Sequence, residues 1–327
     1  MRVLHYISST GMGRGEVYVD LVNTLVKSME VILLIPKNSH YLKRVDPSVE
    51  IMEYQSYDSR ISPLLLAEIY RKIKRAQPDL VHTHFSKASQ IFNQLNYFLK
   101  IPHVATKHNP RKGSIFNRLP HVIAVSKRVK ESIENEHVEI IYNGIQPEKI
   151  NPSHENVLFT LLAIGRLDKV KGFDILLREC AKLDFDFQLQ IIGEGEERVD
   201  LERSIKNLGL QEKVQLLGFR HDIPQSISQS DLVIISSLSE GFGMIIVESL
   251  FYAKTLISTR VGAAEEILSQ KFLIDDFQIA KKINEVYQNR ESFKEEFDDL
   301  AVKTREKFLL ESVASEHKIY YQKVLDR

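Results

Sequence analysis

Two glutamates eight positions apart, Glu240 and Glu248, flank a short glycine-containing segment and could hold the two ends of a sugar diphosphate. The apolar run from Asp231 to Ile235 predicts a buried parallel strand before them, and residues 244–252 have the composition of a helix. The helix N-terminus would offer free backbone N–H groups and a positive dipole end to phosphate. One carboxylate could then bind sugar hydroxyls and the other a ribose diol. Glutamates at this spacing are common by chance, so the hypothesis rests on the strand–loop–helix context.

Further strand ends in the C-terminal half carry basic side chains and glycines. Arg166 and Lys171 follow a predicted strand at residues 158–164, from which they could neutralise a departing diphosphate. Gly193 lies in a predicted strand-to-helix turn, and Arg220 ends a segment that could supply an edge for a flat base. A solvated charged loop is the alternative for the basic segment taken alone. Because ligands bind beyond the carboxyl ends of parallel strands, we expect these residues to meet one ligand.

A glycine-rich loop at residues 11–16 follows the first predicted strand and opens a helix. Gly11 and Gly13 fit the first two glycines of the dinucleotide-binding fingerprint, but Glu16 stands in place of the third. Lys37, rather than an acidic residue, follows the second strand, which disfavours a nicotinamide dinucleotide. The loop is better interpreted as one that lets the backbone approach a ligand closely, with a plain tight turn as the alternative.

Histidines stand at the next two strand ends. His82 and His84 form a His-x-His pair, yet no nearby carboxylate or cysteine completes a metal site with suitable spacing. We therefore expect these two histidines to be hydrogen-bonded at a strand end rather than to bind a metal. His108 follows an apolar strand directly and begins a basic loop, so it is placed to contact a sugar or an anionic acceptor.

The composition is that of an ordinary globular protein, with 327 residues of which 43% are apolar and 27% charged. The 44 basic residues balance 44 acidic ones, whereas a general nucleic-acid binder would show a basic excess. A single cysteine, Cys180, cannot form an internal disulfide and fits a reducing cytosol. We find neither the apolar region of a signal peptide nor a run of roughly 20 apolar residues. We expect a cytoplasmic protein that at most lies on a membrane.

Short β-branched runs alternate with amphipathic stretches in both halves, a pattern typical of parallel sheets covered on both faces. We therefore expect an α/β protein with two doubly wound, Rossmann-like domains that face a cleft. A polar, proline-containing segment suggests a division into residues 1–150 and 151–310. The predicted strands are residues 3–8, 31–35, 80–82, 103–106, 122–125 and 139–141 in the first half, and 158–164, 188–192, 214–217, 232–235 and 255–258 in the second.

Taken together, these segments resemble the retaining GT-B glycosyltransferases, whose signature is a glutamate, seven residues and a second glutamate. The resemblance covers nearly the whole chain and follows the family's order. The segments that carry it are residues 11–16, 78–84, 105–108, 124–126, 141–145, 165–167, 171–172, 193–195, 217–218 and 240–243, and 261–262 with Glu266.

The resemblance implies a role for each candidate residue. Arg166 and Lys171 bind the donor diphosphate, and Glu248 binds the ribose hydroxyls. Glu240 binds hydroxyls of the transferred sugar, and His108 contacts that sugar near the reacting carbon. The catalytic set is thus Glu240, His108, Arg166 and Lys171, and the other donor-binding residues are Gly13, Gly15, Gly193, Arg220 beside the base, Gly241, Phe242, Gly243 and Met244.

The resemblance also implies a mechanism and a topology. Such enzymes retain the anomeric configuration by front-face attack, in which the departing phosphate helps to deprotonate the acceptor. They need no metal and no cofactor besides the nucleotide-sugar substrate. The last helix, which we expect at residues 311–327, crosses back to the N-terminal domain, and that domain engages the acceptor.

Residues 63–75 combine an apolar face with a basic end. Contact with an anionic membrane is one interpretation, to which a nearby basic loop would contribute. A core-facing helix with a solvated basic edge is the alternative. The loop residues are Lys107, Arg111, Lys112 and Arg118.

We expect a transferase that moves a hexose or N-acetylhexosamine from a nucleotide sugar, most readily a UDP sugar, to a glycan or lipid-linked acceptor. The resemblance places it in bacterial lipopolysaccharide, O-antigen or capsule synthesis. A non-catalytic nucleotide-sugar-binding partner of a glycan assembly complex is the alternative, and it has little need of both the cationic pair and both glutamates. An NAD-dependent oxidoreductase is disfavoured by Glu16 and Lys37.

Overall fold

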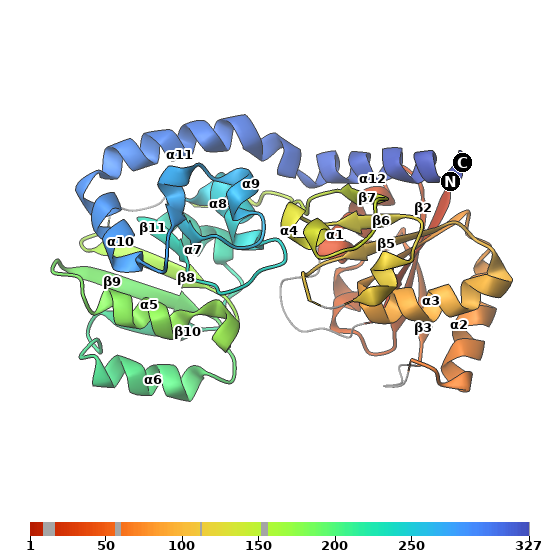
Figure 1. Cartoon of the computed structure of the whole chain (residues 1–327), viewed down its shortest axis with the longest axis horizontal. Helices are drawn as coiled ribbons and strands as arrows, with labels where there is room; N and C mark the ends of the chain where they lie inside the picture. Colours follow the sequence, from red (N-terminus) through yellow and green to blue (C-terminus); the bar gives the residue numbers. More distant parts are fainter. Residues whose placement is uncertain (9–16, 56–59, 112, 152–155, 327) are drawn as a thin grey trace. The chain divides into compact units, whose positions relative to one another are not determined.

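The computed structural model describes residues 1–8, 17–55, 60–111, 113–151 and 156–326 of the chain. These residues form two compact units, one made of Met1–Gln146 with Lys307–Arg327 and the other of Pro147–Glu306 (Figure 1). The divisions follow residues 146 and 306, whereas the sequence predicted them after 150 and 310. The final helix belongs to the first unit.

The first unit is built on a seven-stranded sheet with the strand order β3-β2-β1-β4-β5-β6-β7, in which every pair is parallel. The order reverses between β1 (Arg2–Ile7) and β4 (Leu80–His84), so the carboxyl ends of these strands form a switch point of the kind where ligands bind. The remaining strands are β2 (Glu30–Pro36), β3 (Glu50–Tyr54), β5 (His103–Lys107), β6 (Val122–Ala124) and β7 (Val138–Ile140).

Helices cover both faces of this sheet, and β1 contributes to both cores because successive strand side chains point to opposite faces. Val3 and Ile7 belong to the buried cluster that contains side chains of α1 and α12. Leu4 and Tyr6 belong to the cluster that contains side chains of α2 and α3. Burial on both faces explains the near-continuous apolar sequence of the strand. The helices are α1 (Val17–Leu25), α2 (Pro63–Ala76), α3 (Phe85–Leu99), α4 (Lys127–Glu131) and α12 (Leu310–Leu325).

Helix α2, considered above for membrane contact, packs its apolar face into the first unit. Leu65, Ile69 and Ile73 are buried in the cluster shared with α3. The apolar face of α2 therefore faces the core, as the alternative to membrane contact predicted. Leu64, in the first turn, is 70% exposed. No helix within the described ranges is long and apolar enough to cross a membrane.

The second unit is built on a six-stranded parallel sheet with the strand order β10-β9-β8-β11-β12-β13. The order reverses between β8 (Phe159–Ile164) and β11 (Leu232–Ile235), which creates a second switch point. These two sheets confirm the predicted fold class of two Rossmann-like domains. The other strands are β9 (Phe187–Ile192), β10 (Val214–Gly218), β12 (Leu256–Thr259) and β13 (Leu273–Ile274).

Helices of the second unit pack in two groups, α5 with α6 and α10, and α8 with α7 and α11. Their bounds are α5 (Phe173–Cys180), α6 (Arg198–Asn207), α7 (Ile223–Gln229), α8 (Met244–Tyr252), α9 (Ala264–Ile267), α10 (Ile279–Gln288) and α11 (Arg290–Thr304).

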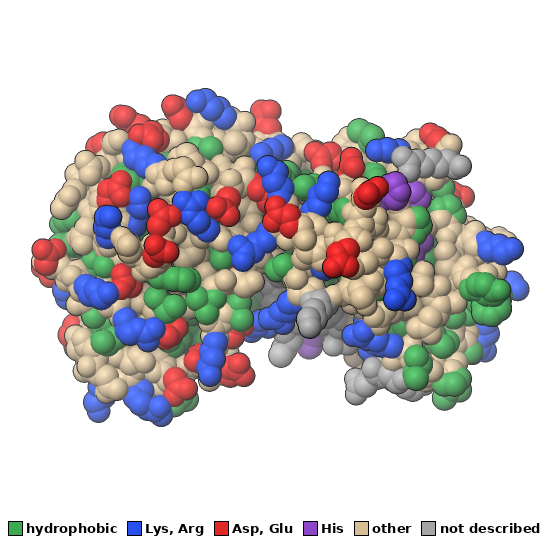
Figure 2. Space-filling view, viewed as in Figure 1, with side chains coloured by type: hydrophobic (Ala, Val, Ile, Leu, Met, Phe, Trp, Pro, Cys, Tyr) green, Lys and Arg blue, Asp and Glu red, His purple; other side chains and the backbone are tan. Residues whose placement is uncertain are grey.

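Charged side chains of both signs are interspersed over the face shown in Figure 2, with no extended region of one sign. This distribution agrees with the formal net charge of zero.

Candidate functional site

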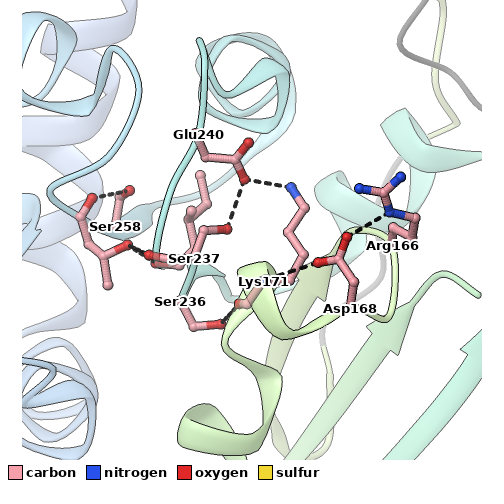
Figure 3. Close-up of polar contacts among 9 residues, drawn as sticks. Arg166, Asp168, Lys171, Ser236, Ser237, Glu240 and Ser258 are labelled. Atoms are coloured by element: carbon pink, nitrogen blue, oxygen red, sulfur yellow. Dashed lines mark hydrogen bonds and ion pairs between the residues drawn. The ribbon is translucent and has the colours of Figure 1, made fainter. Parts of the chain in front are cut away.

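The central feature of the second unit is an ion pair between Lys171 and Glu240 at the carboxyl ends of β8 and β11 (Figure 3). Nζ of Lys171 lies 2.5 Å from Oε1 of Glu240, and the hydroxyl of Ser237 donates to the same oxygen at 2.8 Å. Both charged side chains are mostly buried, with 22% and 17% of their surface exposed. Two residues that the sequence placed at separate strand ends are thus in direct contact.

Polar residues that the sequence analysis missed hold this pair in place. The hydroxyl of Ser236 donates to the backbone oxygen of Lys171 at 2.9 Å (Figure 3). Thr259, at the end of β12, donates to the backbone oxygen of Ser237 at 2.7 Å. The backbones on either side of the ion pair are therefore fixed to each other and to the adjacent strand. Serines directly after an apolar strand were a weak signal, because such residues are common in turns.

Arg166 lies in the same loop but points its guanidinium outward. Its side chain is 72% exposed, and Nε donates to Oδ2 of Asp168 at 2.7 Å (Figure 3). Asp168 also caps the 3₁₀ helix Lys169–Lys171 by accepting from the backbone N–H of Lys171 at 3.2 Å. Asp168 therefore connects both cationic residues, and its place three residues before Lys171 has the spacing of an N-cap.

The segment after Glu240 leads into α8 through a left-handed glycine. Gly243 is the N-cap of this helix with φ 92°. Phe242 is buried, and its carbonyl oxygen accepts from the N–H of Ala263 at 2.9 Å. Gly241 and Met244 are partly exposed on either side, and Glu248 is half-buried in the second turn of α8. The first N–H groups of α8 therefore lie next to the ion pair along the chain, as an anion site at a helix N-terminus requires.

Gly262 supports this segment from the loop after β12. A Cβ atom on Gly262 would lie 2.4 Å from the carbonyl oxygen of Phe242 and 3.0 Å from Cβ of Glu240. Only glycine allows the two loops to approach this closely.

Replacement of Gly262 by alanine should therefore destabilise the second unit more than replacement of Gly209. Both glycines have a positive φ, 55° and 69°, so alanine is strained at either position by roughly 1–2 kcal/mol. No described atom lies within 4 Å of a Cβ built on Gly209, which makes Gly209→Ala a control for the strain alone. Calorimetry should show the larger loss of melting temperature for Gly262→Ala, and equal losses would contradict the packing role.

Gly193 and Arg220 have structural partners in the second unit. A Cβ atom on Gly193 would lie 1.8 Å from the carbonyl oxygen of Gly165, so this glycine permits close packing of two loops. Arg220 donates two hydrogen bonds to the carboxylate of Asp222, at 2.9 and 2.5 Å, and these bonds raise the pKa of its guanidinium. Contact of either residue with a donor stays a prediction. Gly13 and Gly15 lie outside the described residues.

His108 of the first unit directly follows β5. Its Nε2 lies 3.2 Å from Nδ1 of His84, and its ring packs on Phe85 with a centroid separation of 4.5 Å. Burial lowers the pKa of His108 to about 3, although part of the side chain keeps contact with the surface, so the imidazole is neutral near pH 7. A neutral ring can donate or accept a hydrogen bond but carries no charge towards an anion.

His82 and His84 lie in a buried cluster with His5, and ring nitrogens of the three come within 4.8 Å of one another. Both nitrogens of His82 have partners, the hydroxyl of Tyr321 at 2.7 Å and that of Thr106 at 2.6 Å. His82 and His84 are thus hydrogen-bonded at the ends of their strands, and with His5 they bring together three nitrogens of the kind that can ligate a metal. His5 and Tyr321 were not foreseen as members, because they come from the first strand and the last helix.

The fold and the site together define a GT-B type protein with a carboxylate–ammonium pair at a strand switch point. Residues 146–304 match the family model described as glycosyl transferases group 1, and residues 13–149 match the model for glycosyltransferase family 4. The chain belongs to the GT-B glycosyltransferases.

Three curated relatives show the range of similarity. The chain is 30% identical over 210 residues to an uncharacterized glycosyltransferase of Methanocaldococcus jannaschii, with 58% of each protein covered. It is 36% identical over 140 residues to the N-acetylgalactosamine-N,N'-diacetylbacillosaminyl-diphospho-undecaprenol 4-alpha-N-acetylgalactosaminyltransferase of Campylobacter jejuni, covering 41% of this chain and 38% of that protein. The lipopolysaccharide core biosynthesis glycosyltransferase LpsE of Rhizobium meliloti is 23% identical over 272 residues, with 80% and 79% covered. The chain therefore spans less than two thirds of the first two relatives.

Among solved structures, HepE of Anabaena in complex with UDP-glucose is similar over the whole chain. The TM-score is 0.85 at 20% sequence identity, with 99% of this chain and 100% of that chain covered. At this identity the likeness establishes the fold.

Proposed function

We propose that this protein is a retaining, metal-independent hexosyltransferase. It moves a hexose or N-acetylhexosamine from a nucleotide sugar, most readily a UDP sugar, to a glycan or lipid-linked acceptor of bacterial lipopolysaccharide, O-antigen or capsule. The Lys171–Glu240 pair beside the α8 N-terminus is the observation that carries the proposal, because it combines a cation for phosphate with a carboxylate for sugar hydroxyls. Relatives that act on undecaprenol-linked sugars and in lipopolysaccharide core synthesis support the acceptor class.

In the proposed reaction the donor diphosphate lies against Arg166, Lys171 and the first N–H groups of α8. These groups stabilise the charge that develops as the bond from the anomeric carbon to the phosphate oxygen breaks. The acceptor hydroxyl attacks from the same face and passes its proton to the departing phosphate, so the anomeric configuration is retained. Glu240 orients the sugar through its hydroxyls, and Glu248 holds the ribose.

The proposal is tested by incubating the protein with a panel of UDP and GDP sugars and following slow donor hydrolysis by NMR. We expect hydrolysis of a UDP-hexose or UDP-N-acetylhexosamine in the presence of EDTA, with the α-sugar formed first from an α-linked donor. Initial release of the β-sugar would refute retention. Loss of activity on metal removal, restored by a divalent cation, would refute metal independence.

Contact with an anionic membrane is the second part of the proposal. Leu64 is exposed in the first turn of α2, and Arg71, Lys74 and Arg75 are exposed towards its other end. Basic residues near an anionic surface contribute about 1 kcal/mol each. We expect the protein to float with vesicles that contain phosphatidylglycerol and not with purely zwitterionic vesicles.

The charge-reversed double variant Lys74→Glu, Arg75→Glu should lose this flotation. The matched control reverses Arg203 and Lys206, which are exposed on α6 of the second unit. Equal binding by all three proteins, or no binding by the unaltered protein, would exclude the membrane contact.

A further inference from the structure

Three histidines of the first unit, His5, His84 and His108, are joined by two successive hydrogen bonds into an array that ends at His108. Nδ1 of His5 lies 3.1 Å from Nε2 of His84, and Nδ1 of His84 lies 3.2 Å from Nε2 of His108. His5 comes from β1 and His84 from β4, which are paired strands, and β4 pairs with β5, the strand that leads to His108. Three adjacent parallel strands therefore fix the main-chain positions of the three histidines.

The array ends inside the protein at His5. His5 is completely buried, and its Nε2 has no hydrogen-bond partner among the described residues. Burial lowers the pKa of His5 and of His108 to about 3, and that of His84 well below its ordinary value. All three rings are therefore neutral near pH 7, and each carries a proton on one of its two nitrogens.

Because Nε2 of His5 has no partner within the described part of the chain, one distribution of protons over the nitrogens of the three rings is favoured. If Nε2 of His5 carried the proton, a buried N–H would be left without an acceptor, and orphaned buried N–H groups are rarer than under-satisfied acceptors. With its proton on Nδ1, His5 donates to Nε2 of His84. His84 then holds its own proton on Nδ1 and donates to Nε2 of His108, which places the proton of His108 on Nδ1.

At its other end, the array reaches the surface at His108. Nδ1 of His108 forms no hydrogen bond within the described residues, and the His108 side chain is partly exposed. His108 also lines a small cavity of about 20 Å³ together with His84 and His317, which is space for about one water molecule. The N–H of His108 is thus available to a ligand oxygen.

We propose that His5 and His84 are positioning residues that hold His108 as the neutral Nδ1–H tautomer, so that His108 meets the transferred sugar as a hydrogen-bond donor to an oxygen. This inference rests on the proposed function for the identity of the ligand, and on the first unit alone for the tautomer. In this role His108 transfers no proton during the reaction. Its ring nitrogen facing the sugar cannot serve as a base, because it already carries the proton.

The tautomer is measurable without substrate, by two-bond ¹H–¹⁵N NMR of the histidine-labelled full chain at pH 7. We expect a pyrrole-type Nδ1 and a pyridine-type Nε2 for His108, assigned by the loss of its signals in His108→Gln. A protonated Nε2 on His108 would overturn the inference, whether or not the protein proves to be a transferase.

Two variants of His5 separate positioning from packing. His5→Leu removes the donor to His84, so the His108 signals should shift to a mixture of tautomers. His5→Asn keeps an N–H close to the place of Nδ1 and should restore the Nδ1–H tautomer. His103→Leu is the matched control, because His103 is a buried histidine outside the array, bonded to Thr83 at 2.8 Å. Unchanged His108 signals in His5→Leu would overturn the positioning role.

With an active donor, His5→Leu should lower kcat on the order of tenfold or more with little change in KM, since a wrong tautomer withdraws an oriented hydrogen bond. His5→Asn should recover most of that loss. Equal losses in the two variants would mean that His5 only fills space, and would overturn the inference. If no donor is ever turned over while the tautomer is as expected, the proposed function fails and the arrangement of the array stands.

Discussion

The Lys171→Ala variant should lose both sugar transfer and tight binding of UDP. Nζ of Lys171 lies 2.5 Å from Oε1 of Glu240 and is the cation proposed for the diphosphate. Its removal withdraws positive charge from the leaving group, for which a loss in kcat of roughly 10²–10³-fold is typical. It also leaves the mostly buried carboxylate of Glu240 with the neutral hydroxyl of Ser237 as its remaining side-chain partner among the described residues.

The Glu240→Ala variant should differ from Lys171→Ala in a measurable way. It should abolish transfer while largely sparing UDP binding, because Glu240 is assigned to the sugar and not to the nucleotide. Isothermal titration calorimetry with UDP and initial-rate assays with the active donor separate the two effects. Unaltered turnover in either variant would refute the assigned roles.

A surface ion pair of the same unit provides the control. Arg178 and Asp174 on α5 are paired at 2.9 Å, with 58% and 46% of their side chains exposed. Exposed pairs at this helical spacing contribute about 0.3–0.5 kcal/mol, so Arg178→Ala should leave both binding and turnover unchanged. A loss in this variant equal to that in Lys171→Ala would indicate a general effect of removing charge from the unit.

Acidification should unfold the first unit before the second. His5, His82, His84, His103 and His317 are buried in the first unit. Burial lowers the pKa of His5 and His103 to about 3 and of His317 to about 4, and that of His82 and His84 well below the ordinary value. Among the described residues of the second unit, the one histidine, His221, is exposed.

The direction in which stability changes with pH follows from the protons that the folded and the unfolded chain bind. Above pH 6.5, the ordinary histidine pKa, neither the folded nor the unfolded chain protonates these rings, so their contribution to stability is fully present. Below pH 6.5 the unfolded chain binds protons that the folded unit excludes, and stability falls by about 1.4 kcal/mol per pH unit for each histidine. These five histidines together remove about 7 kcal/mol per pH unit, and His108, whose pKa is also lowered, acts in the same direction.

Because a folded domain has a stability of about 5–15 kcal/mol, the first unit should unfold about one to two pH units below 6.5. Hydrogen exchange measured by mass spectrometry resolves the two units by their peptides. We expect peptides of β1, β4 and β5 to lose protection while those of β8 and β11 keep it. Simultaneous loss of protection in both sheets would contradict the histidine origin of the transition.

Most strands could be predicted from their apolar sequence, including the three-residue strands β6 and β7, whereas β3 and β13 could not. β3 was missed because Glu50 and Glu53 interrupt its apolar pattern. It is an edge strand that pairs with β2 alone, and its first residues are exposed. β13 was missed because it has two residues. In both cases the neighbouring strand stabilises an extended segment that its own composition does not favour.

The members of the candidate site could be predicted more fully than their contacts. Lys171 and Glu240 were both placed at strand ends, but they are 69 positions apart, and their contact depends on β8 and β11 being neighbours. The pairing of Arg166 with Asp168 was missed because short acidic residues are frequent in loops for many reasons. The contact of His82 with Tyr321 joins positions 239 apart, so no local pattern could indicate it.

The first unit is assembled from two separated pieces of chain, and this has a consequence during protein synthesis. Residues 147–306 form a continuous unit that can fold as soon as it has left the ribosome. The sheet of the first unit must wait for α12, whose Val313, Tyr321 and Val324 complete one of its two cores. Until then α1 covers that face of the nascent parallel sheet only in part, so the unit that is translated first should be the last to fold.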